Sequence, residues 1–236
     1  MQRKFGRVIQ VVYTVLSVLI VCLFAILLYD VCHKKTIKAR YEKMVNYQTA
    51  NVGDIVWFGR YEQDGNIANG PENIEWLVLE KKDRSLLLIS RHALFSMRAS
   101  AFTETDNQIK QRLNQEFFYE AFLERYHNQV NLNFVPMWRE QWVTAGLTEM
   151  EDLVFCFSEA ELQMFMTTQE DRHCEMTRYA QQLGEISSET VELWALRPNE
   201  DQPEMIPYVD GKGVIRYADE ESTTEFGVRP VIVLWY

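Results

Sequence analysis

The chain has few of the residues that usually build a metal centre or a nucleophilic active site. Its 236 residues include only four histidines and four cysteines. None of the histidines stands in a recognisable catalytic motif with a serine or a cysteine. His173 and Cys174 are adjacent, but no second pair at zinc-like spacing accompanies them. The sequence therefore identifies no catalytic residue, no metal site and no cofactor. The four histidines are His33, His92, His127 and His173.

Cysteine is too scarce for a disulfide framework. Cys22 and Cys32 belong to the N-terminal region, which leaves Cys156 and Cys174 for the rest of the chain. These two could form one disulfide, but Cys156 stands in the apolar run 153–157 and is interpreted as a small buried hydrophobic residue. The cysteines do not indicate a redox compartment.

Basic residues are scarce beyond residue 43. The whole chain holds 24 Lys+Arg and 34 Asp+Glu, and its first 43 residues contain eight of the basic and two of the acidic side chains. Residues 44–236 therefore carry 16 basic against 32 acidic side chains, a formal charge of −16. This charge repels polyanions, so nucleic acid is not expected as a partner. Its main role is interpreted as keeping an exposed domain soluble.

Charged residues are absent from the stretch Val8 to Tyr29, which is twenty-two residues long. As a helix it would span roughly 33 Å, against a hydrocarbon core of about 30 Å. No Ala-x-Ala cleavage site follows it, and the residues before Cys32 are too large for a lipobox. We expect a short tail at 1–7 and an uncleaved transmembrane helix at 8–29, with membrane lipid as its partner.

Basic residues flank this span on both sides. Residues 30–50 are interpreted as a basic juxtamembrane stalk that lies against anionic headgroups. Because more basic residues follow the span than precede it, the positive-inside rule taken alone favours a cytoplasmic C-terminal domain. The flanking residues are Arg3, Lys4 and Arg7 before the span, and Lys34, Lys35, Lys38, Arg40 and Lys43 after it.

The rest of the chain predicts one α+β domain at 51–236, with strands at both ends and helices between them. We expect its terminal strands to pair. Ser158 and Glu161 are spaced as a helix capping box, and Gly184 marks a helix end. The break in the first helix is expected near Phe118. Strands are predicted at 54–58, 74–80, 85–90, 153–157, 191–196, 207–209, 214–217 and 228–235, the first three as a meander, and helices at 108–126, 158–165 and 177–183.

Several short motifs follow one another along this domain. They are Gly53–Tyr61, Asn69–Leu79, Leu86–Ser90, Arg112–Asn114, Phe117–Phe118, Ala121–Phe122, Asp152–Phe155 with Ser158, Asp171–Cys174, Thr177, Tyr179–Ala180, Trp194–Arg197, Asp210–Val214 and Gly227–Pro230. Their order resembles a bacterial family known as domain of unknown function 6273. The resemblance covers most of residues 51–236.

This resemblance implies an exported or membrane-tethered domain in bacteria of the Gram-positive type. We therefore expect a single-pass protein of the cell membrane whose C-terminal domain lies outside the cytoplasm. The closing motifs are similar to the C-type-lectin-like fold shared with formylglycine-generating enzymes, which is an analogy of fold and not of function. A copper oxidase of that type needs a pair of cysteines near its last strands, and none follows Cys174.

The chain departs from the family pattern in two loops. The family's Leu-Arg-Ser-Pro-Gly stretch is shortened to Leu196-Arg197-Pro198-Asn199, and its Gly- and Asn-rich loops are replaced by residues 141–150 and 199–203. If these loops form a ligand face, the ligand differs from that of the relatives. The candidate residues of this face are Trp142, Asn199 and Asp201.

Two arginines stand in apolar strand sequence, where an unpaired guanidinium is costly. We expect Arg197 and Arg229 to form structural ion pairs with carboxylates such as Glu75 or Asp152. Two acidic loop clusters offer oxygen ligands for Ca²⁺ but lack the spacing of a dedicated calcium loop, which favours solvated charge. The clusters are Glu200, Asp201 and Glu204, and Asp219, Glu220 and Glu221.

The sequence favours a membrane-anchored, non-enzymatic recognition module that binds a glycan, a peptide or an envelope protein through its loops. One alternative is a surface hydrolase or modifying enzyme whose active site the motifs do not reveal. Another is a structural subunit of a membrane assembly, although the span lacks a Gly-x-x-x-Gly face. A deep pocket of ionisable side chains would favour the enzyme, and a shallow loop-built face the binder.

Overall fold

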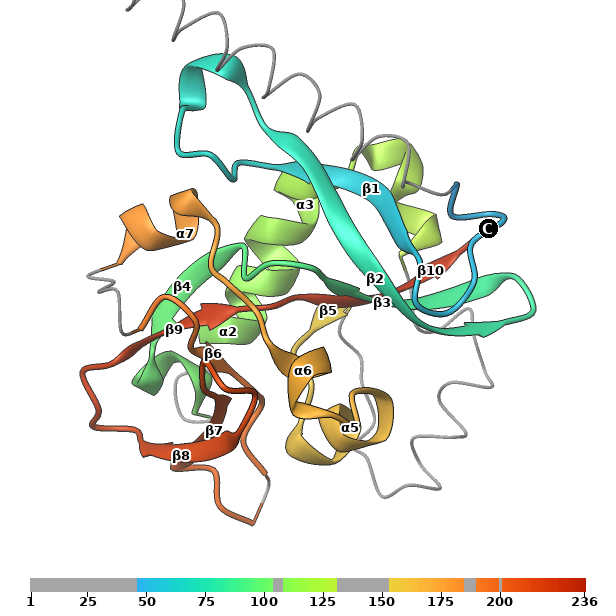
Figure 1. Cartoon of the computed structure of the whole chain (residues 1–236). Helices are drawn as coiled ribbons and strands as arrows, with labels where there is room; N and C mark the ends of the chain where they lie inside the picture. Colours follow the sequence, from blue (N-terminus) through green and yellow to red (C-terminus); the bar gives the residue numbers. More distant parts are fainter. Residues whose placement is uncertain (1–45, 104–107, 131–152, 185–189, 200) are drawn as a thin grey trace, which may run out of the picture. The chain divides into compact units, whose positions relative to one another are not determined.

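Two five-stranded sheets form the framework of the protein (Figure 1). The computed structural model describes residues 46–103, 108–130, 153–184, 190–199 and 201–236. In these ranges the fold is mixed α+β with short helices, as the sequence predicts at this level. No helix of the described ranges is both long and apolar enough to cross a membrane. The predicted span at 8–29 lies outside them.

The first sheet begins with the predicted meander, which the structure confirms. β1 (Ile55–Tyr61) pairs with β2 (Glu72–Lys82), and β2 pairs with β3 (Ser85–Ser90), both antiparallel. All six residues of β3 are buried, because its two faces contact two separate hydrophobic clusters. Leu86 and Leu88 belong to one cluster, and Leu87 and Ile89 belong to the other.

The last strand enters the interior of this sheet. β10 (Val231–Trp235) lies between β3 and β5 (Val154–Phe155) and pairs with both of them antiparallel. The C-terminal strand therefore pairs with the third strand of the N-terminal meander and not with β1. This arrangement gives the sheet the order β1-β2-β3-β10-β5.

The second sheet has the order β4-β9-β6-β7-β8. The pair β6–β9 is parallel, and the other pairs are antiparallel. The predicted strand 191–196 is shorter than expected, because only its last part pairs with β7 and β9. The strands are β4 (Phe95–Arg98), β6 (Trp194–Ala195), β7 (Met205–Val209), β8 (Ile215–Asp219) and β9 (Glu225–Val228).

The predicted strand 228–235 is wrong in its continuity. β9 ends at Val228 in the second sheet, and β10 begins at Val231 in the first. Between them stand Arg229 and Pro230, and proline has no N–H for a strand ladder. The Pro230 carbonyl accepts a hydrogen bond from Ser90 N at 2.9 Å, which fixes the crossing point.

The first helical region runs through α2 (Gln108–Gln111), a π-helical turn η3 (Arg112–Phe117) and α3 (Phe118–Ala121). The backbone stays helical at Phe118 and becomes extended at Phe122, with φ −117° and ψ 129°. The predicted break near Phe118 therefore falls at Phe122, whose ring is buried against Phe58 and Trp76. A 3₁₀ helix, η4 (Glu124–Gln129), follows.

Three further helices begin at side-chain caps. α5 (Glu159–Phe165) has the predicted capping box of Ser158 and Glu161. α7 (Arg178–Leu183) begins after Thr177 and ends at Gly184, as predicted. Three helices were not predicted: α6 (Gln169–Arg172), which starts at a second capping box, and two short 3₁₀ helices, η1 (Ile67–Asn69) and η2 (Ala99–Phe102).

The residues just before β1 belong to the packed domain. The Tyr47 ring lies 5.9 Å from the Phe58 ring and 6.0 Å from the Tyr236 ring, measured between centroids. Ala50 is fully buried. Tyr47 and Ala50, which the sequence assigns to the stalk, therefore pack on the domain.

The two cysteines of the domain are both buried. Cys156 belongs to one hydrophobic cluster and Cys174 to the other. The interpretation of Cys156 as a buried hydrophobic residue is confirmed, and the two form no disulfide.

Candidate functional site

The predicted ligand face lies partly in the described residues. Asn199 and Asp201 are exposed in a turn closed by a hydrogen bond from Gln202 N to Asn199 O at 3.1 Å. Trp142, the third candidate, lies outside the described residues. The same turn leads into β7, so a strand of the second sheet holds it in place.

A second turn lies beside this one. It follows β8, and Glu220 N donates to Glu204 O at 3.1 Å, while Met205 stands opposite Asp219 in the β7–β8 pair. The structure therefore brings together the two acidic clusters that the sequence shows separately. Glu200 lies outside the described residues. The described members, all exposed, are Asp201, Glu204, Asp219, Glu220 and Glu221.

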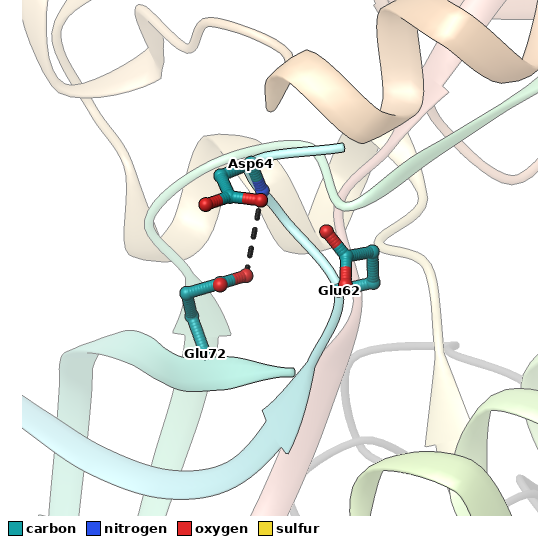
Figure 2. Close-up of side chains that lie close together, drawn as sticks. All are labelled: Glu62, Asp64 and Glu72. Atoms are coloured by element: carbon teal, nitrogen blue, oxygen red, sulfur yellow. Dashed lines mark hydrogen bonds between the residues drawn. The ribbon is translucent and has the colours of Figure 1, made fainter. Parts of the chain in front are cut away.

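A different group of carboxylates converges more closely. Figure 2 shows Glu62, Asp64 and Glu72 in the connection between β1 and β2, with one carboxylate oxygen of each within 4.8 Å of the others. In the described residues this is the group of acidic side chains whose geometry suits a metal ion. Hard oxygen ligands of this kind suit Ca²⁺.

Backbone amides of the same connection donate hydrogen bonds to these carboxylates. Glu72 Oε2 accepts from Gln63 N at 2.8 Å and from Asp64 N at 3.4 Å, the bond drawn dashed in Figure 2. Glu62 Oε1 accepts from Gly65 N at 2.8 Å. The three side chains therefore stabilise a tight loop.

The pKa values of this group follow from the same contacts. Desolvation, together with the charge of Glu72, raises the pKa of Glu62 above its ordinary value. The pKa of Asp64 is lowered, because the Asn69 side-chain amide and the Asn66 N–H donate to it at 2.8 and 2.7 Å. From the sequence, residues 62–71 were predicted only as a turn. The signal for the group was the placement of carboxylates on both sides of that turn.

The predicted ion pair of Arg197 has a different partner. Arg197 Nη2 lies 3.3 Å from Glu161 Oε2, and Glu161 is fully buried. The same oxygen accepts from Ser158 N at 2.6 Å and from Ser158 Oγ at 2.8 Å. Glu75, which was expected to pair with one of the two arginines, pairs with Arg91 at 2.9 Å.

Arg229 is buried, as predicted, with 3% of its surface exposed. Its Nε donates to Ser90 O at 2.7 Å, its guanidinium lies over the Trp194 ring, and its Nη1 is 4.0 Å from Met166 Sδ. No carboxylate of the described residues pairs with it. Burial lowers the pKa of Arg229, and the nearby Cys174 thiol acts in the opposite direction. Asp152 lies outside the described residues.

Three described groups that could take part in catalysis, His127, His173 and Cys174, lie in structural surroundings. His127 Nε2 contacts Phe122 O at 2.9 Å, and His173 Nε2 lies 3.3 Å from a Glu192 carboxylate oxygen. Burial raises the pKa of Cys174, which opposes formation of a reactive thiolate. These contacts position side chains but do not activate a nucleophile.

No family model, no curated protein and no solved structure matches the chain. The described residues define an α+β protein with two five-stranded sheets. The resemblance to domain of unknown function 6273 and to the C-type-lectin-like fold stays a prediction.

Proposed function

We propose that this protein is a non-enzymatic recognition module held at the cell membrane by residues 8–29, with its C-terminal domain outside the cytoplasm. The basic residues after the span contact anionic lipid, and the domain binds a glycan, a peptide or an envelope protein. The observation that carries the proposal is the face formed by two adjacent turns, one with Asn199 and residues 201–204 and one at 219–222. Most of these described residues are exposed and polar, and the strands of one sheet hold both turns.

The proposal is tested with the full chain in lipid nanodiscs, presented to arrays of cell-wall glycans and to purified envelope proteins. The variant Asn199→Ala with Asp201→Ala removes one amide and one carboxylate from the face. Its matched control is Asn128→Ala with Glu124→Ala, which removes the same two groups from exposed positions on η4. We expect at least a tenfold loss of binding for the first pair and parental binding for the control.

Both pairs should melt like the parent, because exposed side chains away from the core change stability by about 0.5 kcal/mol or less. Equal binding by both pairs would reject the face at Asn199 and Asp201. A defined small product released from an array substrate would instead establish the alternative of a surface enzyme. Stable co-purification of other membrane proteins through the N-terminal region, without ligand binding by the domain, would establish the structural subunit.

The topology has its own experiment. Protease added to intact cells should degrade the C-terminal domain while a cytoplasmic control protein stays whole. Protection of the domain under conditions that cleave a known external protein would invert the topology, and the excess of basic residues after the span would then be the correct guide.

A further inference from the structure

The outer edge of β8 is unpaired in the described part of the chain. β8 closes one side of the second sheet and pairs only with β7 (Figure 1). The pairing runs from Ile215 opposite Val209 to Asp219 opposite Met205, with no shift of register. An even, unbulged edge of this kind is a template for another strand.

The direction of the backbone groups on β8 follows from the hydrogen bonds at its two ends. Asp210 N donates to Val214 O at 2.9 Å, and Glu220 N donates to Glu204 O at 3.1 Å. In an antiparallel pair, residues alternate between bonding across to the partner and pointing away from it. Even-numbered residues of β8 therefore bond to β7, and odd-numbered ones point outward.

Two residues of β8 thus present both a free N–H and a free C=O to the open edge, and a third presents its N–H. Ile215 and Tyr217 offer both groups. Asp219 offers its N–H, since its carbonyl accepts from Ser222 N at 3.0 Å. Tyr217 is 50% exposed at the centre of this row.

The other sheet edges are closed in ways that β8 lacks. β1 has a register shift between Trp57 and Arg60, a bulge that bends an edge away from pairing. β4 contacts α7, where Ser96 Oγ donates to Ala180 O at 3.0 Å. At the edge of β5, Asn114 Oδ1 accepts from Leu153 N at 2.8 Å and from Val154 N at 2.9 Å.

The β7–β8 hairpin is held firmly, so little ordering is needed before a ligand binds. At its turn, Gly213 has φ +75°, and a Cβ there would lie 1.9 Å from Gln169 O, so the turn is packed on α6. Along the strand, Tyr217 OH donates to Glu159 Oε2 at 2.6 Å.

The charge beside this edge favours a basic ligand. Carboxylates flank β8 at its centre, where Glu159 lies, and at its end, where the two acidic turns meet. The one arginine of β8, Arg216, is paired with Asp210 at 2.6 Å. A second copy of this domain, with its formal charge of −16, is a poorer electrostatic match than a cationic segment.

We propose that the open edge of β8 binds an extended, basic polypeptide segment as an added strand. The backbone of Ile215, Tyr217 and Asp219 supplies hydrogen bonds, and the neighbouring carboxylates select Lys or Arg side chains. The inference rests on the recognition function proposed above and gives it a ligand class.

The test uses the full chain in nanodiscs of zwitterionic lipid and a fluorescent seven-residue peptide that alternates Lys and Thr. Three probes are compared by anisotropy: this peptide, the same peptide N-methylated at alternate residues, and one that alternates Glu and Thr. N-methylation removes backbone donors but keeps the charge. We expect about tenfold or greater loss for the N-methylated peptide, because several backbone hydrogen bonds are removed together, and no binding for the Glu peptide.

A protein variant gives an independent arm. Tyr217→Pro removes an outward N–H and leaves the bonds to β7, since proline is tolerated on an edge whose N–H faces solvent. Tyr217→Phe is the matched control, which keeps the backbone and loses only the hydroxyl. We expect Tyr217→Pro to weaken binding of the Lys peptide by about tenfold and Tyr217→Phe to bind it within about twofold of the parent. The two variants should melt alike, because both lose the hydrogen bond from Tyr217 OH to Glu159.

Equal binding of the methylated and unmethylated Lys peptides would show that the contact depends on charge alone, and it would reject strand addition. No binding of the Lys peptide, together with a concentration-dependent dimer that Tyr217→Pro abolishes, would assign the edge to a second copy and overturn the proposal. A ligand lost in the Asn199→Ala, Asp201→Ala pair but retained by Tyr217→Pro would leave the recognition function standing and reject only its assignment to β8.

Discussion

The guanidinium carbon of Arg229 lies 5.0 Å from the centre of the Trp194 ring. The same side chain donates from Nε to Ser90 O at 2.7 Å. Trp194 belongs to the second sheet and Ser90 ends β3 of the first, so one buried arginine ties the two sheets together. Its charge is accommodated by a ring face and a carbonyl dipole instead of a described carboxylate.

Arg229→Ala should lower the free energy of unfolding by about 3 kcal/mol, through an unpaired Ser90 carbonyl and a cavity at the crossing of the sheets. Arg229→Met fills much of the space and should cost about 1–2 kcal/mol less than Ala. If Arg229 had a buried carboxylate partner, both variants would leave that carboxylate unpaired and would be destabilised to a similar extent. Denaturant unfolding of the full chain in detergent distinguishes the two outcomes.

Asn114 completes the edge of β5 with its side chain. Its Oδ1 accepts from Leu153 N at 2.8 Å and from Val154 N at 2.9 Å, and its Nδ2 donates to Val154 O at 3.0 Å. Asn114→Ala should cost about 2 kcal/mol because it unpairs these backbone groups. Amide hydrogen exchange at Leu153 and Val154 should accelerate in this variant. Asn114→Asp keeps both acceptor contacts and should protect the same amides better than Ala; equal exchange in Ala and Asp would contradict the assignment.

Glycine is required at position 59 because the backbone has a positive φ there and because no side chain fits. Gly59 has φ +71°, and a Cβ there would lie 2.6 Å from the Phe122 ring and 2.8 Å from Ala121 O. Gly53 has φ +89° with nothing within 4 Å of the corresponding Cβ. Gly53→Ala should therefore show only conformational strain, about 1–2 kcal/mol. Gly59→Ala should lose at least about 1 kcal/mol more, because the added Cβ overpacks the site. Equal melting temperatures for the two variants would show that α3 moves aside without cost.

The contacts of Asp210 predict that the stability of the fold depends on pH. Burial by itself raises the pKa of Asp210, but hydrogen bonds from Arg216 and from two backbone amides outweigh it and leave the pKa below its ordinary value. A carboxyl with a lowered native pKa stabilises the fold above its unfolded pKa, about 3.9, and loses this contribution as the pH falls through the native value. Asp210→Asn keeps the acceptor for the amides but loses the ion pair, so it should cost about 1 kcal/mol at pH 7.

The difference in stability between the parent and Asp210→Asn should shrink as the pH falls below about 4. Arg216→Gln should reproduce most of the loss at pH 7, because it removes the same pair from the other side. A difference that stays constant down to pH 2 would place the effect in packing and not in charge.

The local elements of the fold could be predicted from the sequence because their causes are local. The three-strand meander follows from apolar strand patterns separated by turn residues, and α5 and α7 follow from the caps at Ser158 and Thr177. The split of the predicted strand 228–235 depends on which sheet each half joins, which is a matter of long-range packing. Pro230 marked the place, but an apolar pattern on both sides of it does not reveal a change of sheet.

The candidate sites were likewise predicted only where their features depend on local sequence. Asn199 and Asp201 are exposed in a turn, as expected from a polar loop beside a strand. In the described residues Arg197 pairs with Glu161 and Arg229 has no carboxylate partner, while Glu75 pairs with Arg91. The sequence did not predict these contacts, because a buried arginine can be satisfied by a nearby helix cap, a carbonyl or a ring, and sequence spacing does not rank these. The outward row on β8 depends on sheet order, which hydrophobic patterning does not determine.

The position of β10 inside the first sheet has a kinetic consequence. About 140 residues separate Ser90, at the end of β3, from Val231, at the start of β10. Until β10 has been synthesised, the edge of β3 that pairs with it has no neighbouring strand. At the roughly 5–20 residues per second of protein synthesis, the N-terminal meander would wait roughly 7–28 s for its fourth strand. The nascent chain therefore carries an apolar strand with one unpaired edge for most of its synthesis, and we expect β3 to depend on a chaperone during that interval.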